Sequence, residues 1–398
     1  MIVKLIGLGA AGNKAAITAV DSEIIEIQNV MLLNSTMRDI PAEYQNRPGA
    51  VCHTFQNAYG GCGKERSTSY DLCRSTLEAN SIELDKFLGV NTSESAELVV
   101  IVTSTEGGTG SGSAPLIADF IRQVYGISVH VFGFDGFEDD VRGMRNTVDF
   151  FKEMKPTFTV ECIKNAKFLA QCNNNKIKAE KEANNEFCRK IAVLMGLQIR
   201  DSSHNIDPTD LLKLSTEEGY MIIESYVFSE KIKTTNQFRN AVVDMCDNSK
   251  ALDVEDASQK KLGVIINIKE DNTDYINYVD VLTERFGIPY EKFEHIQHED
   301  GMPEFIAFIA AGMKMPIEEV EATYNKYKDS VQKVDKTQDS FFNTIKDKQI
   351  DPTDKQFDLA KKKDTISASA FFGTNNPTNV SKIASKASGR ISDPKDEF

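Results

Sequence analysis

The sequence predicts an α/β protein in which a Rossmann-like parallel-sheet domain comes first, followed by a long helix, further strands and helices, and a tail. One pattern, which occurs twice, predicts the sheet. An apolar strand runs into a glycine-rich turn and then a helix, once over residues 2–20 and again over 98–121. Parallel neighbours need crossover helices of this kind. The second observation is the helical spacing of apolar residues over 176–200, which predicts the long helix.

Length, charge and cysteine content narrow the class of protein. A chain of 398 residues is long enough for two domains and a tail. Its net charge of −14 argues against direct binding to nucleic acid or to an anionic membrane surface. Seven cysteines without a C-x-x-C pair predict neither a disulfide framework nor a metal site, and are typical of a reducing cytoplasm.

Hydropathy predicts no membrane insertion. No apolar run approaches the roughly 20 residues that a spanning helix needs, and residues 1–7 form too short a run for a signal peptide. We therefore expect a cytoplasmic protein.

The first glycine-rich turn follows the strand at residues 2–6. It reads Gly7-Leu8-Gly9-Ala10-Ala11-Gly12-Asn13, which has the G-x-G-x-x-G spacing of a turn that holds nucleotide phosphates. Taken alone, this motif equally predicts a dinucleotide-binding dehydrogenase. That class needs an acid after the second strand to hold the ribose, but the strand at 30–33 ends in Asn34-Ser35-Thr36. The dehydrogenase is therefore the weaker alternative.

The strongest motif is the stretch from Glu106 to Pro115, between the strand at 98–102 and the helix at 116–121. Glycines and hydroxyl residues fill positions 107–113, so a plain flexible turn is the less favoured interpretation. Glycines let backbone N–H groups converge on anionic oxygens, and the helix N-terminus adds partial positive charge. The stretch is not an ATPase P-loop, because no lysine follows the glycines.

This stretch resembles the signature loop of the tubulin/FtsZ superfamily, G-G-G-T-G-[ST]-G-x-[AG]-P, with Glu106 in place of the first glycine. The first turn fits the same resemblance, with Ala10 and Ala11 where the family has glycines. The resemblance implies a GTP-binding domain over 1–175, a central helix and linker over 176–204, and a smaller α+β activation domain over 205–315. A C-terminal helix over 316–348 and a disordered tail over 349–398 would follow.

The resemblance also implies the residues that bind GTP. The loop at 60–64 would sense the γ-phosphate, with Lys64 as either a phosphate ligand or a solvated loop lysine. Glu138 and Arg142 match the spacing of the family motif F-E-G-x-x-R, with Asp139 in place of the glycine, and the motif places them at the ribose and base. The full implied set is Gly9, Ala10, Ala11, Asn13, Asn34, Gly61, Gly63, Gly107, Gly108, Thr109, Gly110, Ser111, Gly112, Glu138, Arg142, Asn174 and Asn185.

Asn185 on the long helix and Asn174 before it are the candidates for guanine, since an amide can satisfy part of its edge. Helix capping explains the neighbouring asparagines equally well. Lys181 stands where an aromatic residue often stacks on the base. Magnesium would be held mainly by the phosphates.

The catalytic loop implied by the resemblance is Asn205-Ile206-Asp207-Pro208-Thr209-Asp210, which matches N-x-D-x-x-D. In family filaments this loop enters the nucleotide pocket of the next subunit. Asn205, Asp207 and Asp210 would act there, and two carboxylates can polarise the attacking water. The local alternative is that Asp207 or Asp210 caps the following helix, with Pro208 in its first turn. Both roles can coexist.

Further elements complete the prediction. We expect a short strand at 167–171, strands at 261–268 and 304–312, and a helix at 274–286. The stripe Val320, Tyr324, Tyr327, Val331, Val334 and Phe341 predicts a partly buried C-terminal helix. In the tail, Phe371, Phe372 and Phe398 offer docking points for an adaptor.

The sequence as a whole predicts a GTP hydrolase that polymerises with itself head to tail. The C-terminal helix favours a phage or plasmid protein that positions or segregates DNA or phage. A cell-division ring protein and a non-catalytic nucleotide-binding module are the alternatives.

Overall fold

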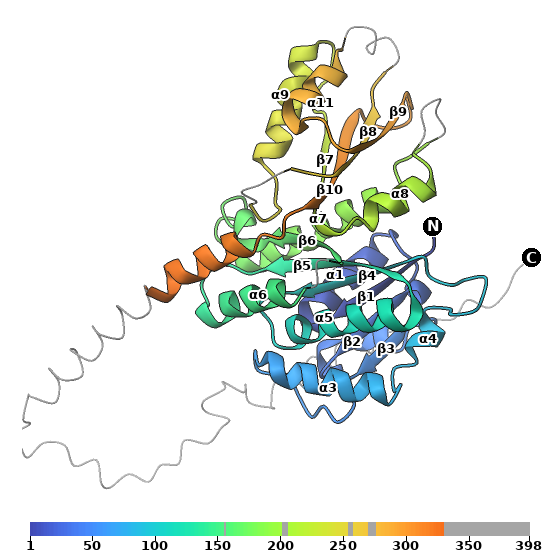
Figure 1. Ribbon diagram of the computed structural model, residues 1–398, viewed down its shortest axis with the longest axis vertical. Coiled ribbons are helices and arrows are strands. Elements are labelled where there is room, and N and C mark those ends of the chain that lie inside the picture. Colours follow the sequence, from blue (N-terminus) through green and yellow to red (C-terminus); the bar gives the residue numbers. More distant parts are fainter. Residues whose placement is uncertain (155–156, 201–205, 254–257, 270–275, 330–398) are drawn as a thin grey trace, which may run out of the picture. The chain divides into compact units, whose positions relative to one another are not determined.

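The computed structural model describes residues 1–154, 157–200, 206–253, 258–269 and 276–329 (Figure 1). In this described part, ten strands form one sheet in the order β3-β2-β1-β4-β5-β6-β7-β10-β8-β9. The strands are β1 (Val3–Leu8), β2 (Val30–Asn34), β3 (Val51–Thr54), β4 (Leu98–Ser104), β5 (Ser128–Asp135), β6 (Thr159–Lys164), β7 (Gly219–Val227), β8 (Lys261–Asn267), β9 (Glu291–Gln297) and β10 (Phe305–Met313).

Helices connect most of these strands. They are α1 (Gly9–Asp21), α2 (Ala42–Gln45), α3 (Arg66–Glu78), α4 (Leu84–Phe87), α5 (Thr109–Phe120), α6 (Val141–Glu153), α7 (Lys176–Leu194), α8 (Pro208–Ser215), α9 (Thr235–Asp247) and α11 (Tyr278–Phe286). A further helix covers 317–329.

The six strands from β3 to β6 are all parallel and follow the Rossmann order 3-2-1-4-5-6. The strand order reverses between β1 and β4. In such sheets ligands bind at the carboxyl ends of the strands beside this reversal. The α/β prediction is therefore confirmed, and the topology already points to the turns that follow β1 and β4.

Two apolar layers cover the sheet. Leu5 of β1 packs into a layer with α1, α7 and α8, whereas Ile6 packs into the layer with α3, α5, α6, α9 and α11. Burial on both faces explains why strands such as β4 are continuous apolar runs. Ala15, Ala16 and Ala19 are fully buried, and their small side chains let α1 lie close to the sheet.

The junction between β6 and β7 is the narrowest pairing in the sheet. Only two register pairs join these strands, Thr159 with Gly219 and Val160 with Tyr220. Beyond the junction, β10 lies antiparallel between β7 and β8. The long helix α7 contacts both β6 and β7, and therefore bridges the junction.

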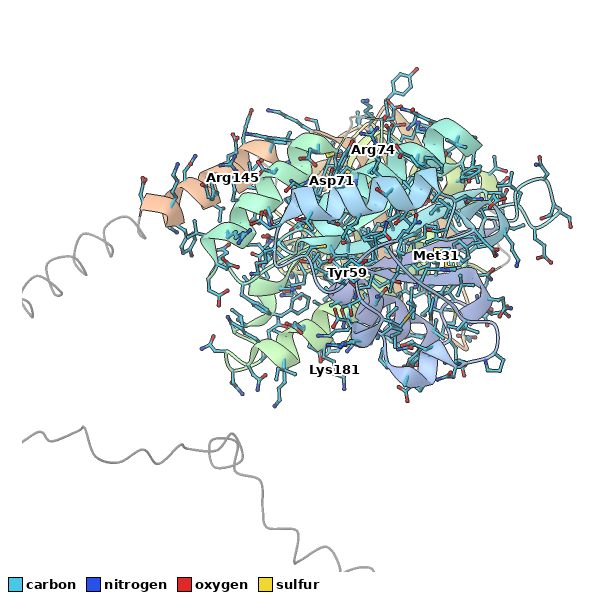
Figure 2. The ribbon with its side chains drawn as sticks, turned by 90° about the horizontal axis from the view of Figure 1, so that it is seen from below. Met31, Tyr59, Asp71, Arg74, Arg145 and Lys181 are labelled. Carbon is cyan, nitrogen blue, oxygen red and sulfur yellow. The ribbon has the colours of Figure 1, made fainter. Side chains whose placement is uncertain are left out.

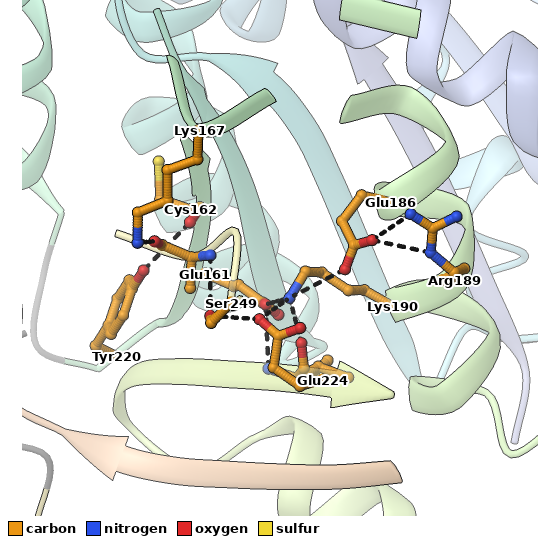
Figure 3. Close-up of polar contacts among 11 residues, drawn as sticks. Glu161, Cys162, Lys167, Glu186, Arg189, Lys190, Tyr220, Glu224 and Ser249 are labelled. Atoms are coloured by element: carbon orange, nitrogen blue, oxygen red, sulfur yellow. Dashed lines mark hydrogen bonds and ion pairs between the residues drawn. The ribbon is translucent and has the colours of Figure 1, made fainter. Parts of the chain in front are cut away.

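A buried charge cluster lies beside this junction (Figure 3). The Nζ atom of Lys190 on α7 lies 2.8 Å from Glu161 Oε1 on β6 and 3.1 Å from Glu224 Oε1 on β7. Glu186 is 3.8 Å from the same ammonium. Burial raises the pKa of Glu161 to about 7. Three carboxylates around one ammonium make this cluster acidic, and the residues come from both sides of the junction.

Four predicted elements differ from the structure. The helix expected at 116–121 begins at Thr109, within the glycine-rich stretch, and the helix expected at 274–286 begins at Tyr278. The short strand expected at 167–171 is wrong, because a 3₁₀ helix (Asn165–Phe168) and a turn occupy that region and the strand is β6. The long helix begins at Lys176 as predicted but ends at Leu194 instead of near residue 200. Gly196 follows in a left-handed conformation with φ 67°, the usual way in which a glycine ends a helix.

The helix over 317–329 lies against α6. Val320 is buried, the Lys152 ammonium pairs with Glu321, and Arg145 stacks 5.8 Å from the Tyr324 ring (Figures 1 and 2). The remainder of the predicted C-terminal helix and the tail, residues 330–398, lie outside the described residues. Among the described helices, none is both long and apolar enough to cross a membrane.

Candidate functional site

Two helix N-termini meet where the strand order reverses. Helix α1 begins at Gly9 directly after β1, and α5 begins at Thr109 just beyond β4. Gly9 has a φ of 73°, and a Cβ there would lie 3.3 Å from the backbone nitrogen of Gly110. In the described part of the chain neither N-terminus is capped by a side chain, and neither has an acid in its first turn. Unpaired N–H groups at such ends bind anions, so the pair is a candidate phosphate site.

The glycines of the two turns have a second role, which is close packing. A Cβ on Gly12 would overlap the carbonyl of Val102, and one on Gly110 would overlap the hydroxyl of Thr103. A Cβ on Gly108 would lie 2.9 Å from the backbone of Lys64. The sequence analysis assigned these glycines to phosphate approach alone. In the structure they also hold both helix N-termini against β4 and the loop before α3.

Hydroxyl and amide groups line the same place. The Ser35 and Thr109 hydroxyls lie 2.9 Å apart, and Ser69 donates to the Thr109 carbonyl over 2.6 Å. Asn34 donates to Asp39 over 3.1 Å. The buried Oδ1 of Asn13 has no hydrogen-bond partner among the described residues. The structure thus brings together predicted residues of the segments at 7–13, 34–36 and 107–113.

Glu106 stands immediately before this phosphate loop. Burial, followed by the negative charge of Asp135, raises the pKa of Glu106 to about 7. Its carboxylate fills a space left by two glycines, because a Cβ on Gly136 would overlap it and one on Gly143 would lie 2.9 Å from its Cδ. Burial raises the pKa of Asp135 to about 6. The departure from the family motif is therefore accommodated by the opposite loop and helix.

The loop from Gly136 to Asp140 forms a charged rim. Glu138 pairs with Lys164 at 2.5 Å and accepts a hydrogen bond from the Tyr327 hydroxyl at 3.0 Å. The other ion pairs at this rim are Lys64 with Asp140, Lys176 with Asp139, and Arg142 with Glu65. Lys64 and Glu138 both have positive φ, 64° and 58°, which is uncommon for residues other than glycine and asparagine. Such backbone strain clusters at functional loops.

The comparisons with known proteins agree with this geometry. Residues 2–173 match the family model described as Tubulin/FtsZ family, GTPase domain. This part of the chain matches the GTPase domain of the tubulin/FtsZ family. The match ends just before α7, so it covers β1 to β6 and both glycine-rich turns.

Individual relatives extend the likeness. The chain is 24% identical over 212 residues to the tubulin-like protein TubZ of Clostridium botulinum C phage, covering 52% of this chain and 54% of that protein. It is 23% identical over 271 residues to the cell division protein FtsZ of Buchnera aphidicola subsp. Schizaphis graminum. That alignment covers 67% of this chain and 66% of the FtsZ protein. These alignments thus leave about half of the TubZ protein and a third of the FtsZ protein unmatched.

A solved structure with the same fold is the GTPγS-form protofilament of Bacillus thuringiensis serovar israelensis TubZ. Its TM-score is 0.70 at 15% identity, and the alignment covers 85% of this chain and 94% of that one. This likeness shows that the tubulin/FtsZ fold continues beyond the family match, through α7 and into the second half of the sheet.

The predicted guanine ligands of this tubulin/FtsZ-family domain lie near the start of α7. Asn174 is exposed with φ 58°, and the half-buried Asn185 donates to Glu182 over 3.4 Å. A pocket between the preceding loop and α7 is lined by Gln171, Cys172, Asn173, Lys178, Lys181 and Glu182. Lys181 is exposed on α7 (Figure 2). The base-reading role of both asparagines stays a prediction.

The predicted catalytic acids begin α8. Asp207 accepts a hydrogen bond from the Asp210 N–H over 2.9 Å, and Asp210 Oδ2 accepts from the Asp207 N–H over 3.3 Å. This is a reciprocal capping box with Pro208 in the first turn. Asp207 is exposed and Asp210 half-exposed, so both carboxylates remain accessible. Capping is thus one role, the catalytic role stays a prediction, and Asn205 lies outside the described residues.

The sequence analysis missed four residues that build the site. Asp135 accepts a hydrogen bond from the Thr147 hydroxyl, and the Ser69 hydroxyl donates to the Thr109 carbonyl. Arg66 donates to the Ser111 carbonyl over 2.9 Å, and Asn146 donates to two loop carbonyls. One signal was available, because Asn146 lies one turn before the apolar Phe150 on the same face of α6. A polar residue on a core-facing stripe needs a partner, but the sequence does not say which.

Proposed function

We propose that this chain is a GTP hydrolase that assembles with itself head to tail into filaments. The observation that carries the proposal is the meeting of the α1 and α5 N-termini beside the reversal of strand order. This site supplies backbone donors and hydroxyls for a phosphate chain. The family match over 2–173 supports GTP as the nucleotide.

The position of the acids supports hydrolysis at a junction between subunits. Helix α7 has 19 residues, so it spans about 28 Å at 1.5 Å per residue. Its first residue, Lys176, pairs with Asp139 at the rim of the nucleotide site, whereas Leu211 of α8 packs beside Gly196 after its last turn. Asp207 and Asp210 are therefore far from their own phosphate loop, and a second copy of the chain would bring its acids to it.

In this arrangement the phosphate loop and Lys64 would orient the triphosphate, and the two acids of the neighbouring subunit would orient and polarise the attacking water. Phosphoryl transfer depends mainly on such positioning and on neutralisation of charge. Magnesium would be held mainly by the phosphates.

The biological role that we propose is the positioning or segregation of DNA or phage particles. The likeness to a phage TubZ supports it, as does the helix over 317–329 that follows the last strand. Exposed segments such as the loop of Tyr59, which is 99% exposed, are available for contacts between copies (Figure 2).

The test is GTP turnover against protein concentration, recorded together with light scattering. Turnover per molecule should rise sharply at the concentration where scattering begins. The variant Asp207→Asn with Asp210→Asn should still scatter but lose turnover, because asparagine retains the helix cap without the charge. Asp280→Asn is the matched control, since Asp280 is also an acid in a first helical turn, that of α11.

Three results would reject parts of the proposal. Turnover proportional to concentration down to dilute protein would reject the shared site. Unchanged turnover in the double variant would reject the role of the acids. Binding of GTP without any turnover would leave a non-catalytic tubulin-like module.

A further inference from the structure

The side chain of Asn146 joins two loops of the candidate nucleotide site. Asn146 lies on α6 and is 7% exposed. Its Nδ2 atom donates to the carbonyl of Glu106 over 2.9 Å and to the carbonyl of Lys64 over 3.1 Å. These two acceptors lie 40 and 82 residues away in the sequence. One buried amide thus uses both of its donors to connect two segments that lie far apart in the sequence.

Each acceptor begins a part of the site that faces the phosphates. Glu106 directly precedes the phosphate loop, and Lys64 carries the ammonium that is the candidate ligand of the terminal phosphate. The Lys64 backbone has a φ of 64°. It lies so close to Gly108 that a Cβ added at Gly108 would be 2.9 Å from the Lys64 backbone. The relative position of the two loops is therefore defined closely. Asn146 links them through the Lys64 and Glu106 carbonyls, and Arg66, just after Lys64, adds a bond to the Ser111 carbonyl.

The Lys64 ammonium pairs with Asp140 in the structure. To reach a phosphate it would have to leave this carboxylate by rotation of its side chain. This rotation brings the ammonium to the phosphate only if the backbone of Lys64 stays fixed relative to the phosphate loop. The 3.1 Å bond from Asn146 to the Lys64 carbonyl fixes that backbone.

We propose that Asn146 is a positioning residue for recognition of the terminal phosphate. Its amide holds the Lys64 loop against the phosphate loop, so that the Lys64 ammonium can exchange Asp140 for the γ-phosphate of GTP. The inference rests on the proposed function and deepens it, because it assigns discrimination between GTP and GDP to one buried amide outside the two glycine-rich turns.

The experiment compares GTP and GDP affinities of the full chain by nucleotide titration. Asn146→Ala should weaken GTP binding about tenfold and change GDP binding by less than about twofold, since a charged hydrogen bond to the terminal phosphate is lost. Lys64→Met should produce the same pattern. The double variant should lose no more than either single variant, because both changes remove one interaction. Asn248→Ala, which removes an exposed amide at the C-cap of α9, is the control.

The outcomes separate the inference from the proposed function. Equal weakening of GTP and GDP by Asn146→Ala, or additive losses in the double variant, would overturn the inference and indicate a purely structural amide. If Asn146→Ala does not fold, Asn146→Ser, which keeps one donor, must still show a selective loss for GTP. Wild-type protein that binds neither nucleotide would reject the proposed function itself.

Discussion

The hydroxyl of Tyr327 donates a hydrogen bond to Oε2 of Glu138 over 3.0 Å. The helix over 317–329 thus contacts the loop in which Glu138 is the candidate ligand of the ribose. The same carboxylate also pairs with Lys164 at 2.5 Å. A ribose hydroxyl that donates to Glu138 would therefore compete with the tyrosine for one acceptor.

This competition gives the first prediction. Tyr327→Phe should raise the affinity for GTP about two- to fivefold. The ribose hydroxyl then no longer has to displace the tyrosine hydroxyl from the charged Glu138 carboxylate. The affinity for 2′,3′-dideoxy-GTP should not change. Tyr290→Phe, at a residue that is 93% exposed, is the control. Equal gains for both nucleotides would show that Glu138 does not bind the ribose.

The second prediction separates the capping role of Asp207 from catalysis. Asp207→Ala should lower the free energy of unfolding by about 1 kcal/mol, because α8 loses its N-cap. Asp207→Asn should change it by only a few tenths of a kcal/mol. Urea unfolding monitored by circular dichroism measures both. Equal losses for the two substitutions would mean that the carboxylate charge, and not the cap geometry, stabilises the helix.

The third prediction concerns Glu106 and pH. Its pKa in the folded chain is about 7, above the ordinary value of 4.5. Between these values the folded state holds more protons than the unfolded state, so this residue's contribution to stability is full below about pH 4.5 and is lost as the pH rises to about 7. Glu106→Gln cannot lose a proton. Its stability relative to the wild type should rise over this range by up to about 3 kcal/mol and then level off.

Urea unfolding at several pH values between 4.5 and 8.5, without nucleotide, tests this expectation. A difference between the two proteins that is constant with pH would show that Glu106 is ionised throughout in the folded chain. Glu65→Gln serves as the control, because Glu65 is exposed and pairs with Arg142.

The fourth prediction concerns the buried cluster around Lys190. Lys190→Met should lower the free energy of unfolding by about 3–5 kcal/mol, because three carboxylates remain without their ammonium. Glu161→Gln should cost much less, since burial raises the pKa of Glu161 to about 7 and the amide removes a charge that burial disfavours. The double variant should recover part of the loss. A cost below about 1 kcal/mol for Lys190→Met would show that water enters the cluster.

Some elements could be predicted from sequence and others could not, for a physical reason. The strand at 98–102 can be predicted from its unbroken apolar run, and the turn at 107–113 from its glycines. Strand β6 does not, because the buried Glu161 makes its sequence look polar. Its partner Lys190 is 29 positions away, and the pairing exists only in the folded chain. Strand β9, with buried His295 and Gln297, was missed for the same reason.

The candidate site follows the same rule. The two glycine-rich turns follow from local pattern. The strand order that brings them together was not predicted, because β1 and β4 pair although they lie far apart in the sequence. Asn146 could not be assigned, because its acceptors are backbone carbonyls, which every residue has. The contact between Tyr327 and Glu138 likewise depends on how the last helix lies against α6. The predicted domain boundaries, the roles of Asn174 and Asn185, and the catalytic role of Asp207 and Asp210 stay predictions.

The narrow pairing of β6 with β7 has a mechanical consequence. Torsion between the two halves of the sheet is resisted there by two backbone pairs, whereas β5 and β6 share six and β7 and β10 share eight. The sheet is therefore most compliant along one line, with α7 lying across it as a stiff rod. In a polymer of this chain, each subunit could bend at its own β6–β7 junction. Curvature could then arise inside the subunits, and the contacts between them need not deform.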